Sequence, residues 1–89
     1  MTTASAGTLE SMDCLVTITA LAAGEGIKTE ITGASAARFK TAMTKKILET
    51  MAELGAKDAC VSVQDNGALD VVLGARVEAA WARLQRGND

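Results

Sequence analysis

Apolar and polar residues alternate with a period of two in three segments of the chain, residues 15–20, 27–31 and 59–63. This period is typical of a β-strand with one buried face, so the pattern predicts three strands. Gly24 and Gly26 lie between the first two segments and favour a turn there. We therefore expect the first two strands to form an antiparallel hairpin.

Two longer segments carry apolar residues at the spacing of an amphipathic helix. The first covers residues 39–54, follows possible N-cap residues at 32–35 and ends before Gly55, which suits a left-handed C-cap. Residues 65–67, Asp-Asn-Gly, are expected to end the third strand in a turn. The second helical segment covers residues 69–84, with an acidic residue in its first turn and basic residues near its end, as the helix dipole favours.

The length of 89 residues leaves room for one small domain, which we expect to be of the α+β class. The predicted order is strand–strand–helix–strand–helix, as a three-stranded sheet with two helices packed on one face. Small polar residues at the start of the chain predict a mobile N-terminal arm over residues 1–13. Residues 14–86 would then form the folded domain and residues 87–89 a tail.

Composition argues against several classes of function. A formal net charge of -2 is unlike the basic surface of a nucleic-acid-binding protein. The longest uncharged stretch, residues 14–24, is too short to span a membrane, and residues 1–13 do not resemble a secretory signal. The chain has no histidine and only two cysteines, Cys14 and Cys60. We therefore expect no metal site, no catalytic site, and reduced, buried thiols in a cytoplasmic protein.

Two stretches of sequence are more specific than this general pattern. The first is Ala-Gly-Thr-Leu-Glu-Ser-Met-Asp at residues 6–13, directly before the first predicted strand. The second is Gly-Ala-Leu-Asp at residues 67–70, which continues through Leu73, Ala75-Arg76 and Glu78-Ala79. At this separation, in a chain of this length, the pair resembles the acyl carrier (gamma) subunit of citrate lyase. The resemblance extends over nearly the whole chain, from about residue 6 to residue 83.

The resemblance implies that Ser11 is the cofactor-binding residue. In that family, the serine of the Gly-Thr-Leu-Glu-Ser segment carries phosphoribosyl dephospho-coenzyme A through a phosphodiester, which makes the carrier a phosphoprotein. A small residue usually follows this serine in the family, whereas Met12 follows it here. The polar surroundings of Ser11 suit a site that a modifying enzyme must enclose.

The same resemblance implies a carrier function rather than an enzymatic one. The carrier would hold acetyl and citryl thioesters on its prosthetic group while citrate is cleaved to acetate and oxaloacetate. The expected partners are the citrate lyase alpha subunit (citryl/acetyl transferase) and beta subunit (citryl lyase), a holo-carrier synthase and an acetate ligase, with no nucleic acid and no membrane. The alternatives are a carrier of citramalate lyase or of a related lyase or decarboxylase, and a non-catalytic protein-interaction module.

Several charged residues allow two interpretations. Glu10 and Asp13 flank Ser11 and either keep the arm hydrated or are recognised by the modifying enzyme. Arg76 lies in the apolar stripe of the second helix, where it either reaches to solvent from the edge of the core or contacts another subunit. The first helix has a basic surface, which is either solvated or binds an acidic partner; it consists of Arg38, Lys40, Lys45 and Lys46.

Overall fold

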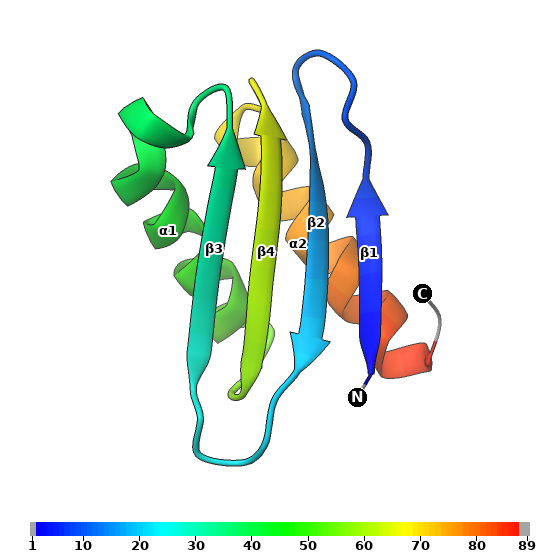
Figure 1. Ribbon diagram of the computed structural model, residues 1–89. Helices are drawn as coiled ribbons and strands as arrows, with labels where there is room; N and C mark the ends of the chain where they lie inside the picture. The colour runs from blue at the N-terminus through cyan, green and yellow to red at the C-terminus, as the bar shows by residue number, and fades with distance from the viewer. Residues whose placement is uncertain (1, 88–89) are drawn as a thin grey trace.

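The computed structural model describes residues 2–87, which form a four-stranded sheet with two helices packed on one face (Figure 1). The elements are β1 (Thr3–Gly7), β2 (Asp13–Ala20), β3 (Ile27–Gly33), α1 (Ala36–Glu53), β4 (Ala59–Asn66) and α2 (Asp70–Arg86). The strand order is β1-β2-β4-β3, with β4 antiparallel to β2 and parallel to β3. The predicted α+β class and the two helices are confirmed.

The predicted number of strands is wrong, because residues assigned to the N-terminal arm form β1. This strand pairs antiparallel with β2, from Thr3 opposite Thr19 to Gly7 opposite Leu15. Its buried side chains are only Ala4 and Ala6, which lie under α2. Because alanine is small and only weakly hydrophobic, the alternation of buried and exposed residues in β1 cannot be recognised from the sequence alone. In the described part of residues 1–13, β1 and a hairpin turn replace the expected arm.

The predicted hairpin between β2 and β3 is also wrong, because β4 lies between these two strands. Residues 21–26 pass across the start of β4, where the carboxylate of Asp58 accepts hydrogen bonds from the N–H groups of Gly24 (3.0 Å) and Gly26 (2.8 Å). Helix α1 then connects β3 to the parallel β4, as a crossover of this kind requires. The antiparallel hairpin of the molecule is instead formed by β1 and β2.

The core lies between the sheet and the helices and is almost entirely aliphatic. Helix α2 covers β1 and β2, and α1 packs on β3 and against α2. Cys14 is buried and Cys60 is half-buried, and burial raises the pKa of Cys14 to about 11. The largest fully buried side chains are those of Ile18, Ile47, Met51, Leu73, Val16, Val61, Val63 and Val77.

Three connections meet at one end of the sheet, the upper end in Figure 1. They are the β1–β2 turn (residues 8–12), the β3–α1 connection (residues 34–35) and the β4–α2 connection (residues 67–69). Both helices also begin at this end. Near the C-terminus, α2 ends at Arg86, and its C-cap residue Gly87 adopts a left-handed conformation. The remaining residues of the predicted tail, 88 and 89, lie outside the described part of the chain.

Candidate functional site

Ser11 lies in the turn of the β1–β2 hairpin, at the upper end of the sheet. Its side chain is exposed. Within residues 2–87, its hydroxyl takes part in none of the hydrogen bonds of the structure. The neighbouring Met12 is 63% exposed and adopts a left-handed conformation, with a φ of 65°. The turn therefore presents the Ser11 hydroxyl to solvent.

The base of this turn is attached to α2 through Asp13. Arg76 donates two hydrogen bonds to the Asp13 carboxylate, from Nε to Oδ1 (3.0 Å) and from Nη2 to Oδ2 (2.8 Å). The hydroxyl of Thr8 donates a further hydrogen bond to Oδ2 (2.7 Å). The Arg76 guanidinium, followed by the Thr8 hydroxyl and the Cys14 N–H, holds the pKa of Asp13 well below its usual range. Paired bonds of this kind fix both distance and orientation.

The other side of the turn is attached to β4 through Asn66. The Met12 N–H donates a hydrogen bond to the backbone oxygen of Asn66 (2.7 Å). The side-chain amide of Asn66 donates one to the backbone oxygen of Leu9 (3.0 Å). The backbone on both sides of Ser11 is therefore fixed by strand and helix, while the serine side chain is exposed and forms no hydrogen bond among residues 2–87.

The structure shows a contact of Asp13 and Arg76 that the sequence analysis did not consider. The two side chains bind each other, and this ion pair attaches the hairpin to α2. Sequence reasoning missed the pair because its members lie 63 positions apart. The one available signal was the position of Arg76 in an apolar stripe, where a charged side chain needs a partner. Glu10 is exposed beside Ser11.

Asp65 holds the β4–α2 and β3–α1 connections together at this end of the sheet through its carboxylate and its backbone oxygen. Its buried carboxylate accepts hydrogen bonds from the N–H groups of Gly67 and Ala68 (both 3.0 Å), and its backbone oxygen accepts one from Ala34 (3.0 Å). Burial raises the pKa of Asp65, but these N–H groups and Ser35 together lower it overall. The predicted turn at residues 65–67 begins two residues later, at Gly67, since β4 continues through Asn66.

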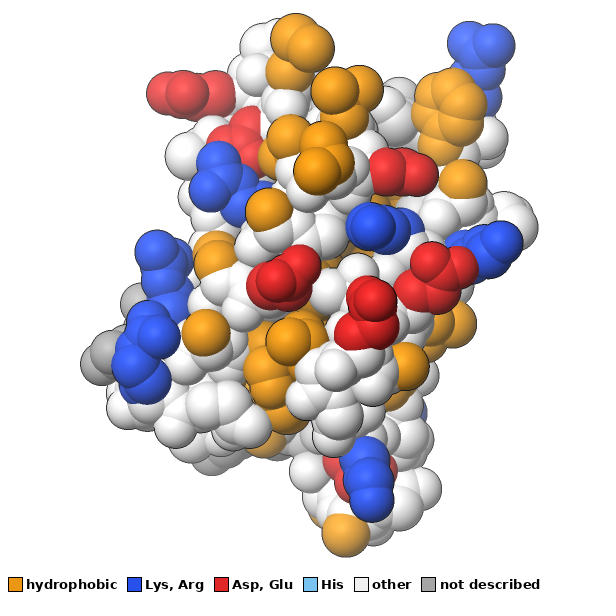
Figure 2. Space-filling model, turned by 180° about the vertical axis from the view of Figure 1, so that it is seen from behind, with side chains coloured by type: hydrophobic (Ala, Val, Ile, Leu, Met, Phe, Trp, Pro, Cys, Tyr) orange, Lys and Arg blue, Asp and Glu red, His pale blue; other side chains and the backbone are white. Residues whose placement is uncertain are grey.

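A groove opens beside the hairpin, between the first turns of α1 and α2. It has a volume of about 440 Å³. Two of its apolar side chains are largely exposed, Phe39 at 49% and Leu69 at 59%. Figure 2 shows hydrophobic side chains gathered near the upper end of the helical face. The groove is lined by Ser35, Phe39, Ala42, Met43, Gly67, Ala68, Leu69 and Asp70.

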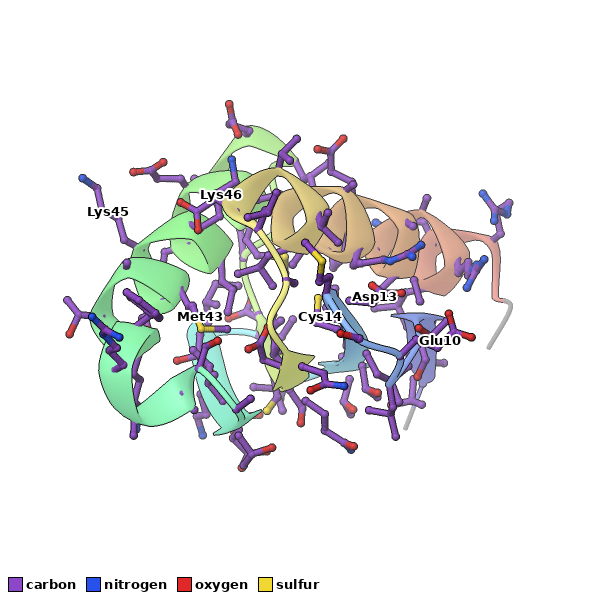
Figure 3. All side chains as sticks on the ribbon, turned by 90° about the horizontal axis from the view of Figure 1, so that it is seen from above. Glu10, Asp13, Cys14, Met43, Lys45 and Lys46 are labelled. Carbon is purple, nitrogen blue, oxygen red and sulfur yellow. The ribbon has the colours of Figure 1, made fainter. Side chains whose placement is uncertain are left out.

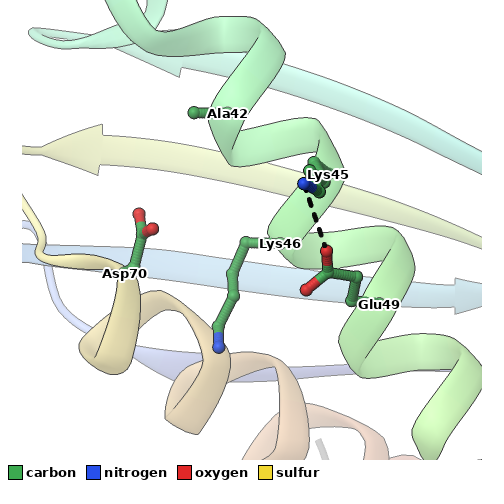
Figure 4. Close-up of a pocket in the computed structure, with 5 residues that line it drawn as sticks. All are labelled: Ala42, Lys45, Lys46, Glu49 and Asp70. Atoms are coloured by element: carbon green, nitrogen blue, oxygen red, sulfur yellow. Dashed lines mark ion pairs between the residues drawn. The ribbon is translucent and has the colours of Figure 1, made fainter.

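A view onto this end relates the groove to the hairpin (Figure 3). Glu10 and Asp13 lie on the side of β1 and β2, Met43 lies on the side of α1, and Cys14 lies between them. A smaller hollow of about 300 Å³ adjoins the groove, because Ala42 and Asp70 line both. Its remaining lining residues are Lys45, Lys46 and Glu49 (Figure 4).

Neither a metal-binding cluster nor a membrane-spanning helix is found in the described part of the chain. Among residues 2–87, no three or more His, Cys, Asp or Glu side chains are grouped so that they could hold a metal ion. None of the helices in this part of the chain is long and apolar enough to cross a membrane. Burial raises the pKa of Cys60, as it does that of Cys14.

Comparisons with known proteins identify the family. Residues 1–84 match the family model described as ACP, malonate decarboxylase delta subunit (MdcD). The chain belongs to this acyl carrier family. The carrier is also similar to the citrate lyase acyl carrier protein of Klebsiella pneumoniae, with 49% identity over 80 residues that cover 90% of this chain and 81% of that protein.

Two further relatives are similar to the carrier over most of their length. Citrate lyase acyl carrier protein 2 of Salmonella typhimurium is 42% identical over 80 residues, which cover 90% of this chain and 81% of that protein. The citrate lyase acyl carrier protein of Halothermothrix orenii is 36% identical over 87 residues, which cover 98% of this chain and 90% of that protein. The resemblance inferred from the two sequence motifs is confirmed.

The structure of the carrier brings these two motifs together. Residues 6–13 form the end of β1, the hairpin turn and the start of β2, while residues 67–70 lead into α2. Asp13 forms a bridge with Gly67 and an ion pair with Arg76. A Cβ on Gly7 would lie 1.9 Å from the backbone oxygen of Cys14 and 3.1 Å from Arg76 Cδ, so only glycine fits there. Two segments that are distant in sequence therefore form a single site around Ser11.

Proposed function

We propose that this chain is the acyl carrier subunit of a citrate lyase complex and that it presents a covalently attached group on Ser11. The observation that carries the proposal is an exposed hydroxyl at the tip of a hairpin whose backbone is held by Arg76 on one side and Asn66 on the other. Relatives named citrate lyase acyl carrier protein, at 49% and 42% identity, support the choice of complex.

The group proposed for Ser11 is phosphoribosyl dephospho-coenzyme A, joined through a phosphodiester. The residues present fit such an attachment, because the hydroxyl is exposed and makes no hydrogen bond within residues 2–87 that modification would break. When bound, this group supplies a thiol at the end of a long flexible chain, on which acyl groups are carried as thioesters. The two protein thiols are less accessible for this role, since Cys14 is buried and Cys60 is half-buried.

The carrier's own residues hold the point from which the arm moves. With the turn fixed by Arg76 and Asn66, the arm starts at a constant position relative to any subunit that binds the domain. Each transfer between active sites then becomes an intramolecular step at a high effective concentration. Acid–base chemistry would belong to the alpha and beta subunits of the lyase, while a holo-carrier synthase attaches the group and an acetate ligase acylates it in the cytoplasm.

A second candidate function is the carrier of a malonate decarboxylase. The description of the matching family model favours it, because the model is named for a subunit of that enzyme. Both candidates use Ser11 in the same way, and they differ in the partner subunits. Reconstitution of the modified carrier with the lyase subunits and, separately, with decarboxylase subunits would distinguish them, since only the matching partners would regain turnover.

The mass of the intact protein from its native host tests the proposal most directly. We expect a single large adduct on the wild-type chain and the bare polypeptide mass for Ser11→Ala. Ser5→Ala is a matched control, because Ser5 lies on β1 and its hydroxyl already bonds that of Thr17 (2.9 Å). That variant should keep the adduct. A wild-type chain without an adduct, or an adduct that persists in Ser11→Ala, would contradict the proposal.

A further inference from the structure

The groove between α1 and α2 has the size and surface of a small-molecule site. Its volume of about 440 Å³ falls within the range of ligand pockets. Phe39 and Leu69 expose about half of their surface there, although large apolar side chains are normally covered in a domain of this kind. The backbone of α1 is also irregular at Phe39, with φ of -119° and ψ of 15°.

The groove begins where the Ser11 turn ends. Gly67 lines the groove, and a Cβ built on it would lie 3.9 Å from the Cα of Met12. The N–H of Met12 bonds the residue before Gly67, at 2.7 Å. A group attached to Ser11, one residue before Met12, therefore starts at the edge of the groove and needs no partner protein to reach it.

The chemistry of the lining selects one part of the proposed arm. Dephospho-coenzyme A consists of an adenine nucleoside, a diphosphate and a pantetheine chain that ends in the thiol. Phosphates cannot leave water for an apolar floor without a large cost in solvation. The adenine base is flat, aromatic and uncharged, so it matches a groove that contains the ring of Phe39 and several aliphatic side chains. Its amino group also has an acceptor there, the carboxylate of Asp70.

The adjoining hollow complements the part of the arm next to the base. Lys45 and Lys46 both line it, and Lys45 is paired with Glu49 at 3.9 Å. Lys46 makes no ion pair among the described residues and extends towards α2, where its Nζ would lie 3.4 Å from a Cβ built on Gly74 (Figure 4). Its ammonium group is the cation best placed to approach a phosphate oxygen of a nucleotide bound in the groove.

We propose that the groove holds the adenine base of the arm attached to Ser11, so that the arm is anchored at two points. This inference rests on the proposed function, since it requires the nucleotide-containing group on Ser11. Only the pantetheine portion then swings freely, which shortens the path that the thiol explores between partner active sites. The same contact leaves the reactive end of the arm outside the groove, where partner subunits can reach it.

Nuclear magnetic resonance of labelled carrier, with and without the arm, tests this arrangement. Intact mass first establishes that the loaded sample carries one adduct. We expect the loaded protein to show shifted signals for Phe39, Met43 and Leu69, together with nuclear Overhauser contacts from adenine protons to the Phe39 ring and to the side chains of Met43 and Leu69. Phe39→Ala should lose the contacts to Met43 and Leu69, and the signals of these two residues should match those of the same variant without the arm. Leu48→Ala is a matched control, since Leu48 is 43% exposed on α1 but does not line the groove.

The outcomes separate this inference from the proposed function. An adduct on Ser11 with shifts confined to residues 8–12 would overturn the groove as the site of the base, and it would leave the carrier function intact. A protein with no adduct on Ser11 would overturn both. Adenine contacts with Met43 and Leu69 that survive in Phe39→Ala, or that are lost equally in Leu48→Ala, would also overturn the inference.

Discussion

The two ends of the sheet each carry a turn that is held by an aspartate, and the two aspartates are held differently. At the lower end in Figure 1, Asp58 bonds only backbone N–H groups of the connection it closes, those of Gly24 and Gly26. At the upper end, Asp13 bonds Arg76 of a helix that comes 63 residues later. The end that bears Ser11 is therefore fixed by a side-chain ion pair with a helix, whereas the opposite end is closed by hydrogen bonds from backbone N–H groups to a carboxylate.

The exposed apolar surface also differs between the two ends of the sheet, and most of it lies at the upper end. Five of the six large hydrophobic side chains that are exposed in the described chain belong to segments at the upper end or to the first turns of the helices, the sixth being Leu48. These five are Leu9, Met12, Phe39, Leu69 and Val71. The comparison indicates that the upper end combines a rigid backbone with a surface suited to binding.

The largest expected effect comes from adding a methyl group at a glycine of each end. Gly7→Ala should lower the free energy of unfolding by about 3 kcal/mol or more, because the Cβ would meet the backbone of Cys14 at 1.9 Å. Gly24→Ala meets no atom within 4 Å and should cost only about 1–2 kcal/mol for its positive φ. Urea denaturation of both variants measures the difference, and equal losses would contradict the contrast between the ends.

A second variant breaks the ion pair that attaches the hairpin to α2. Arg76→Met should lower the free energy of unfolding and speed hydrogen exchange of the amides in residues 8–12, because Asp13 loses its bidentate partner. Lys28→Met is the control, since its pair with Glu25 is exposed and 3.5 Å long. If both variants left exchange in the turn unchanged, Arg76 would not fix the hairpin.

The same pair predicts a dependence of stability on pH. The pKa of Asp13 is lower in the folded protein than the value of about 3.9 for an unfolded chain. Its contribution to stability is therefore complete above the unfolded-state pKa and is lost as the pH falls through it towards the folded-state pKa. Urea midpoints between pH 7 and pH 3 should fall less steeply for Asp13→Asn than for the wild type. The urea midpoint of Asp13→Asn should still fall to some extent with pH, because the pKa of Asp65 is also lowered. Parallel curves of midpoint against pH for the variant and the wild type would contradict the prediction.

The smallest expected effect is at Ser11 itself. Ser11→Ala should change the free energy of unfolding by less than about 0.5 kcal/mol, because the hydroxyl is exposed and makes no hydrogen bond within residues 2–87. Denaturation of the unmodified protein measures this change. A loss of several kcal/mol would show that Ser11 has a structural role and would weaken the contrast between the fixed base and the free tip of the hairpin.

The elements with strong alternation or helical spacing could be predicted from the sequence. Residues 15–20, 27–31 and 59–63 lie in β2, β3 and β4, and the two amphipathic segments lie mainly in α1 and α2. The strand β1 could not be found in this way, because Ala4 and Ala6 are too small to mark a buried face. The position of β4 between β2 and β3 was hidden too, since alternation identifies a strand without identifying its neighbours.

The site was predictable only in part. A motif, and not periodicity, drew attention to Ser11, and the structure adds that the residue lies at a hairpin tip. The contacts of Asn66 and Arg76 with this hairpin join residues 57 and 63 positions apart, and a single sequence carries no record of such pairs. The groove was equally hidden, because it forms only where two helices begin side by side.

The residues that hold the hairpin, Asn66 and Arg76, lie in the last third of the chain. This position has a consequence for biosynthesis. Ser11 is synthesised 55 residues before Asn66 and 65 residues before Arg76. A polypeptide that stops short of these residues would therefore possess the serine without the shape that surrounds it. An enzyme that recognised this shape would act only on chains that extend at least through Arg76.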